Sequence, residues 1–130
     1  MSALFSCQDL SIAVAGRTLV QDLSFTVSPG ELLAVLGRNG TGKTLTMHTL
    51  AGLRAAAGGQ VLLRGTDVAA ARRQQTARHL ALLPQHVDDI FPATVIDTVM
   101  IGRHPPIGRF QWESASDHAI GRAALAAVGL

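Results

Sequence analysis

The segment from Gly37 to Thr44 has the residue types and spacing of a phosphate-binding loop. It matches a pattern of glycine, four residues of any type, glycine, lysine, and then serine or threonine. Glycines let the backbone curl so that successive amide N–H groups converge on phosphate oxygens. We call this segment the phosphate loop, and its residues are Gly37, Arg38, Asn39, Gly40, Thr41, Gly42, Lys43 and Thr44.

Lys43 and Thr44 supply the charge and the metal ligand that a bound triphosphate requires. The lysine ammonium suits the β- and γ-phosphates, and the threonine hydroxyl suits Mg²⁺. A lysine at a helix start is otherwise unfavourable because it faces the positive end of the helix dipole. Lys43 is also the only lysine among eleven basic residues. The loop therefore predicts a nucleoside triphosphate ligand, with Mg-ATP expected, and a glycine turn without a ligand is the alternative.

The elements on either side of the loop are of the kind that would position it. Residues 31–36 form a continuous apolar run, which predicts a strand buried on both faces. From Lys43 to Leu53 the pattern is helical, so unsatisfied N–H groups and the positive dipole end would meet the loop. The expected inner face of that helix consists of Leu45, Met47, Leu50 and Leu53.

Other segments predict the rest of an α/β arrangement. Residues 10–14 and 23–27 are short β-type stretches around a turn, which predicts antiparallel strands before the phosphate loop. Residues 79–83 predict another strand, halted at Pro84. Residues 94–101 and 116–128 predict helices.

Composition limits the class of protein. The chain has 130 residues, 48% of them hydrophobic and 15% charged, which fits one globular domain. No apolar run reaches the roughly 18–20 residues of a membrane-spanning helix, and the first ten residues lack a secretory pattern, so we expect a cytoplasmic protein. A net charge of +2 without a dense basic face argues against nucleic-acid binding. The five histidines show no zinc-ligand spacing.

Beside the phosphate loop, the sequence contains the segments Gly30-Glu31, Leu50-Ala51-Gly52-Leu53, Gly59-Gln60-Val61, Arg64-Gly65 and Leu82-Leu83-Pro84-Gln85. With these segments it resembles, over its whole length, the ATP-binding subunits of ABC transporters. The resemblance implies an α/β fold: an incomplete P-loop NTPase of ABC-ATPase type with N-terminal antiparallel β strands, a core strand–phosphate loop–helix unit and the start of the helical subdomain. Residues 1–90 would be the β-rich and phosphate-loop core up to the Q-loop, and residues 91–130 the beginning of the helical subdomain.

The resemblance also implies roles for single residues. Gln85 resembles the Q-loop glutamine, which would position Mg²⁺ and the attacking water and act in catalysis together with Lys43. ATP would be bound by the phosphate loop and by the backbone amide of Leu45, and Mg²⁺ by Thr44 and Gln85. The family often has an aromatic residue that stacks on adenine where this chain has Val14, so base stacking is weakened or comes from another residue.

Within the family, Thr94-Val95 and the segment from Met100 to Pro105 are most similar to importer subunits for iron-siderophores, haem or cobalamin. The implied partners are a second ATP-binding subunit and a membrane permease, which would hold the protein on the inner face of the cytoplasmic membrane. Another ABC-class ATPase, in an exporter or a soluble role, is an alternative.

The sequence ends at Leu130, before the family's signature motif and its second acidic strand with the metal-binding and catalytic carboxylates. The resemblance implies ATP hydrolysis for the family. Because the signature motif and these carboxylates are missing here, this chain alone is expected to be inactive. A nucleotide-binding module with no turnover of its own is a further alternative.

Overall fold

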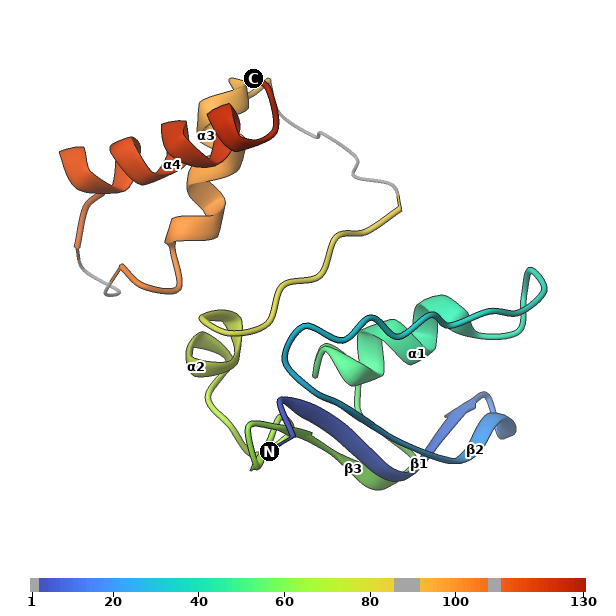
Figure 1. Cartoon of the computed structure of the whole chain (residues 1–130). Helices are drawn as coiled ribbons and strands as arrows, with labels where there is room; N and C mark the ends of the chain where they lie inside the picture. Colours follow the sequence, from blue (N-terminus) through green and yellow to red (C-terminus); the bar gives the residue numbers. More distant parts are fainter. Residues whose placement is uncertain (1–2, 86–91, 108–110) are drawn as a thin grey trace. The chain divides into compact units, whose positions relative to one another are not determined.

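The computed structural model describes residues 3–85, 92–107 and 111–130, which form two compact units (Figure 1). The first unit, residues 1–76, holds the sheet and the phosphate loop, and the second, residues 77–130, is helical. A short helix, α2 (Arg73–Ala77), lies at the boundary in the sequence. The division predicted after residue 90 lies outside the described residues and stays a prediction.

The first unit is built on an antiparallel sheet with the strand order β2-β1-β3-β4. The central strand β1 has partners on both sides, which buries Leu10 and Ile12 completely. The tight β1–β2 turn uses positive φ angles at Ala15 (49°) and Gly16 (78°), as a two-residue hairpin turn requires. The antiparallel strands predicted before the loop are confirmed. The strands are β1 (Phe5–Val14), β2 (Arg17–Val27), β3 (Gly58–Leu63) and β4 (Thr66–Asp67).

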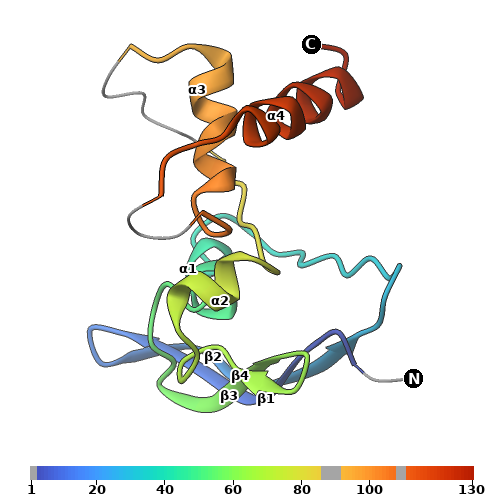
Figure 2. The same cartoon turned by 90° about the vertical axis from the view of Figure 1, so that its left-hand side faces the viewer.

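Helix α1 (Lys43–Leu50) follows the phosphate loop and lies over one face of the sheet (Figures 1 and 2). Its buried face consists of Thr46, Thr49 and Leu50. Both threonines are buried at little cost because their hydroxyls donate to carbonyls one turn back in the chain, at 3.0 and 2.8 Å.

The inner face predicted for this helix is only partly correct. Leu50 is buried, but Met47 and Leu53 are exposed. The helix ends at Leu50, and Gly52 follows in a left-handed conformation with φ of 71°, so Leu53 is no longer on the helical face.

Two predicted strands are absent. Residues 31–36 belong to no strand, and Leu32 and Leu36 are 93% and 90% exposed. Residues 79–83 likewise form no strand, and Leu83 is exposed. A buried parallel strand requires hydrogen-bonded neighbours on both sides. Among the described residues no strand pairs with either segment, so apolar character alone did not produce a strand.

The second unit contains α3 (Val95–Met100), the 3₁₀ turn η1 (Ile101–Arg103) and α4 (Ala115–Ala127). Both helices predicted here are confirmed, each beginning with a reciprocal capping box. The α4 box uses Ser114 as the cap, so this helix begins slightly earlier than predicted.

Close approach of α3 and α4 depends on a glycine. A Cβ at Gly121 of α4 would lie 3.0 Å from Sδ of Met100, which is almost fully buried. None of the helices in the described ranges combines the length and the apolar character needed to cross a bilayer.

We predict that Gly59→Ala destabilises the first unit far more than Gly16→Ala. Both glycines have a positive φ, 76° and 78°, so both substitutions carry the same backbone strain. A Cβ at Gly59 would collide with the carbonyl oxygens of Gln8 and Asp9 in β1, whereas nothing lies within 4 Å of one at Gly16. Urea unfolding should show a loss of about 1 kcal/mol for Gly16→Ala and of about 3 kcal/mol for Gly59→Ala. Equal losses would contradict the described pairing of β1 with β3.

Candidate nucleotide-phosphate site

The phosphate loop is a tight turn whose carbonyl groups are held by its own side chains. The ammonium Nζ of Lys43 donates to the carbonyl oxygens of Gly37 and Arg38, at 2.6 and 2.8 Å. The hydroxyl of Thr41 also donates to the Arg38 carbonyl, at 2.8 Å. These bonds turn the carbonyls toward the lysine. The curl itself requires positive φ angles at Gly40 (81°) and Gly42 (94°).

Backbone amide donors collect where the loop meets α1. Gly42 is the N-cap, and no side chain caps the helix start. Within the described residues the N–H groups of Lys43, Thr44 and Leu45 have no acceptor. The first turn of the helix thus offers free N–H groups and a positive dipole end beside the lysine ammonium, which is an arrangement that binds phosphate.

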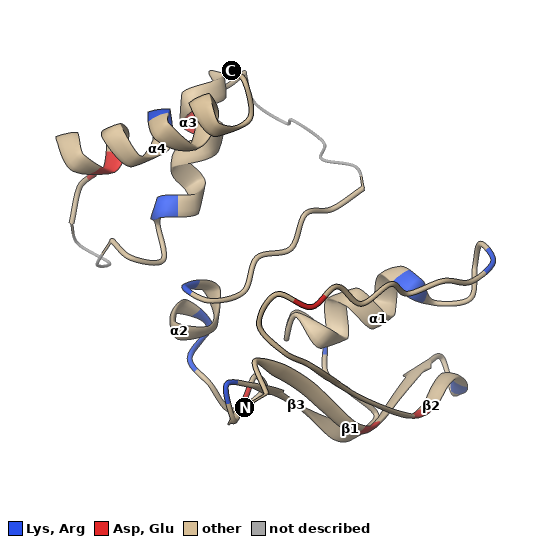
Figure 3. Ribbon diagram, viewed as in Figure 1, with Lys and Arg blue, Asp and Glu red and all other residues tan. Residues whose placement is uncertain are grey.

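The structure places the end of the β1–β2 hairpin beside the loop, in the region where the resemblance puts Val14 near the adenine. A cavity of about 460 Å³ lies between the phosphate loop and the end of the β1–β2 hairpin. Figure 3 shows basic positions at the loop, at the start of α1 and at the hairpin end. The residues themselves indicated only a turn at this hairpin, and its place near the nucleotide followed from the resemblance alone. The cavity is lined by Arg17, Thr18, Leu19, Arg38, Asn39, Gly40 and Thr41.

Two predicted ligands of Mg²⁺, Thr44 and Gln85, lie in different units of the chain. Thr44 is exposed at the first turn of α1, and its hydroxyl has no partner among the described residues, so it is available to a metal ion. Gln85 is exposed and belongs to the second unit. Its cooperation with Thr44 on one Mg²⁺ stays a prediction.

Comparison with known proteins covers the segment that contains this loop. A family model described as ABC transporter matches residues 20–128, which include the whole phosphate loop and the hairpin strand β2. This chain belongs to the ABC transporter family.

Among curated members of the family, the chain is similar to the hemin import ATP-binding protein HmuV of Deinococcus radiodurans. The two are 41% identical over 122 residues, which cover 94% of this chain and 45% of the relative. An uncharacterized ABC transporter ATP-binding protein of Haemophilus influenzae is 36% identical over 114 residues, covering 88% of this chain and 43% of the relative. This chain therefore spans less than half the length of these two relatives.

The solved structures show the same fold. An inward-facing structure of a metal-chelate type ABC transporter superposes with a TM-score of 0.78 at 24% identity, covering all of this chain and 46% of that one. An ATP-binding subunit of an ABC transporter gives a TM-score of 0.65 at 24% identity, covering 75% of this chain and 40% of the other. The predicted ABC-ATPase fold class is confirmed, although residues 31–36 do not form the core strand expected in it.

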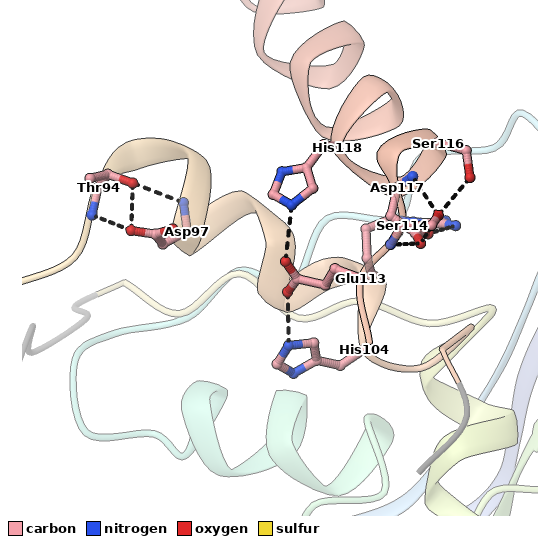
Figure 4. Close-up of polar contacts among 9 residues, drawn as sticks. Thr94, Asp97, His104, Glu113, Ser114, Ser116, Asp117 and His118 are labelled. Carbon is pink, nitrogen blue, oxygen red and sulfur yellow. Dashed lines mark hydrogen bonds and ion pairs between the residues drawn. The ribbon is translucent and has the colours of Figure 1, made fainter. Parts of the chain in front are cut away.

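The second unit of this ABC family member carries a separate group of polar contacts (Figure 4). Glu113 lies between two imidazoles, with Oε1 3.6 Å from Nε2 of His104 and Oε2 3.3 Å from Nε2 of His118. Figure 4 shows the two rings on opposite sides of the carboxylate. Across the described ranges, no group of three or more histidine, cysteine or acidic side chains is arranged to hold a metal ion.

Asp117 is the most strongly perturbed carboxylate of this group. Its Oδ2 accepts from the hydroxyl and the N–H of Ser114, at 2.6 and 3.0 Å, and its Oδ1 accepts from Nη2 of Arg103 at 2.8 Å. The hydrogen bonds from Ser114, followed by the one from Arg103, lower the pKa of Asp117 to about 2. Asp117 at the start of α4 is thus hydrogen-bonded to Arg103 at the end of η1.

We predict that acid loosens the start of α4 through Asp117. Its folded pKa of about 2 lies below the unfolded value of about 3.9. The stabilisation is therefore complete above about pH 4 and is lost as the pH falls toward 2. Far-UV circular dichroism should show helix loss in this interval. Asp117→Asn keeps a hydrogen-bond acceptor but does not titrate, so its helix loss over the same interval should be smaller. An unchanged acid profile in Asp117→Asn would contradict this assignment.

Proposed function

We propose that this chain binds Mg-ATP through the phosphate loop, as part of the ATP-binding subunit of an ABC-type importer. The observation that supports this most is the start of α1, whose free N–H groups directly follow a loop with carbonyls that hold the Lys43 ammonium. The ammonium and the N–H groups belong to one short segment, residues 37–45, which joins a cation to backbone donors. Such a site selects for polyphosphate.

The roles of the other site residues follow from the resemblance to the family. The phosphate-loop residues and the amide of Leu45 would bind the phosphates. Thr44 and Gln85 would bind Mg²⁺, which neutralises charge on the β- and γ-phosphates. In an ATP-binding subunit of the length of the relatives, Gln85 and Lys43 would take part in ATP hydrolysis.

The cargo we propose is hemin or another iron chelate. Several curated relatives are named hemin import ATP-binding proteins, with identities of 41% in Deinococcus radiodurans and 34% in Methylobacillus flagellatus. We include iron-siderophores and cobalamin in the proposal, because the sequence resembles importer subunits for all three kinds of cargo. Such a protein would pair with a second ATP-binding subunit and dock on a permease at the cytoplasmic face of the membrane. Absence of turnover in this chain alone stays a prediction.

Lys43→Ala should lower the affinity for Mg-ATP on the order of 100-fold, because a charge-assisted bond to the phosphates is lost. Calorimetric titration of the 130-residue chain would measure this. Arg72→Ala is the matched control, since it removes an exposed positive charge of the same unit outside the loop. The proposal fails if the unsubstituted chain does not bind Mg-ATP, or if Lys43→Ala binds it equally well with an unchanged circular dichroism spectrum.

Thr44→Ala should weaken Mg-ATP binding by about 10-fold and leave metal-free ATP binding nearly unchanged. The reason is that only the hydroxyl is lost, while the backbone N–H that faces the phosphates remains. Titrations with and without Mg²⁺ separate the two contributions. Equal weakening in both would show that Thr44 acts at the helix start and not on the metal.

A further inference from the structure

Residues 32–36, directly before the phosphate loop, are apolar and have open backbone groups, and we call them the open segment. Within the described residues, none of their N–H and C=O groups takes part in a hydrogen bond, and no strand pairs with them. None of them has a positive φ, and in Figure 2 this part of the chain runs as an extended thread. An extended segment with unpaired backbone groups is a template for a further strand.

The exposed fractions alternate along the open segment as they do in a strand. Leu32 and Leu36 are 93% and 90% exposed, whereas Leu33 and Val35 are 47% and 43% exposed. Successive side chains of a strand point to opposite faces. Leu33 and Val35 therefore share a half-covered face, and Leu32 and Leu36 share a fully open face with Ala34, which is also exposed. A second strand with apolar side chains would cover this open face.

The open segment is complementary to a second copy of itself. Antiparallel pairing centred on Ala34 places Leu32 of each copy opposite Leu36 of the other, so the two open faces join into one apolar stripe. In the same register Leu33 lies opposite Val35, and the two Ala34 residues lie opposite each other. A two-fold axis at Ala34 relates the copies, so the same surface is used on both of them.

Charge favours this antiparallel register over a parallel one. Glu31, the charged residue directly before the open segment, would lie opposite Gly37 of the second copy. The carbonyl of Gly37 holds the Lys43 ammonium at 2.6 Å, so the carboxylate is brought toward a cation. A parallel, in-register pair would instead place the two Glu31 carboxylates side by side, and like charges in that position are destabilising. The antiparallel pair thus combines apolar cover with charge complementarity.

We propose that two copies of this chain associate by antiparallel pairing of their open segments, in the absence of nucleotide. This contact is separate from the pairing with a second ATP-binding subunit proposed above, and it does not rest on the proposed nucleotide site. Five residue pairs make a small interface, so the dissociation constant should be on the order of 100 μM.

The test is sedimentation equilibrium of the nucleotide-free 130-residue chain at roughly 10–500 μM, a range that brackets this constant. Ala34→Asp and Ala34→Lys each place like charges opposite each other, so each variant alone should associate about 10-fold more weakly. An equimolar mixture of the two variants places opposite charges at this position and should restore association. Circular dichroism of each variant verifies folding.

The matched controls are Leu83→Asp and Leu83→Lys, because Leu83 is 91% exposed and belongs to the other unit. These variants, alone or mixed, should change association less than about 2-fold. Association that returns only in the mixture of the two Ala34 variants supports the proposal, because mixing does not repair two misfolded chains.

The proposal is overturned if the unsubstituted chain is monomeric over the whole range, including the case in which a different polypeptide binds its open segment. Association that the Ala34 charges leave unchanged, or that the Leu83 variants weaken equally, would place the contact on another surface. Oligomers larger than a dimer would contradict the two-fold pair. Weak association of both Ala34 variants without recovery on mixing would contradict the register centred on Ala34.

Discussion

The junction between the phosphate loop and α1 at Gly42 is the constraint on which the described site depends. Its φ of 94° lets the chain turn from the loop into the helix, and the missing side chain lets Leu19 of the hairpin approach. The helix start, the lysine and the hairpin therefore meet at one residue. A larger residue there would disturb both the turn and the packing of the loop against β2.

Strand formation in this chain follows the availability of partners more than apolar character. Strand β1 is moderately polar, yet it is central and buried because β2 and β3 pair with it on either side. Residues 31–36 are far more apolar, yet they remain outside the described sheet and expose Leu32 and Leu36. The N–H and C=O groups of a strand can be buried only when neighbouring strands hydrogen-bond to them. The contrast between these two segments shows how strongly pairing outweighs composition.

Family membership and local geometry inform different parts of the proposal. The match over residues 20–128 identifies an ABC transporter family member, and several of its relatives are named hemin import ATP-binding proteins. Neither shows how distant segments meet at the loop. The structure shows this at the hairpin end, where the cross-strand pair of Val14 and Arg17 adjoins a loop more than twenty residues later in the sequence.

The sequence by itself determined the phosphate loop, the antiparallel strands before it and the helices around Val95–Met100 and Ala115–Ala127. These are local features: glycine conformations, capping residues and short-range periodicity act within a few neighbours along the chain. Tertiary structure decided the rest. It placed Thr46 and Thr49 in the core where Met47 and Leu53 were expected, left residues 31–36 without sheet partners, and brought Arg17 to the phosphate loop. Those outcomes depend on contacts between distant segments, for which one sequence carries no local signal.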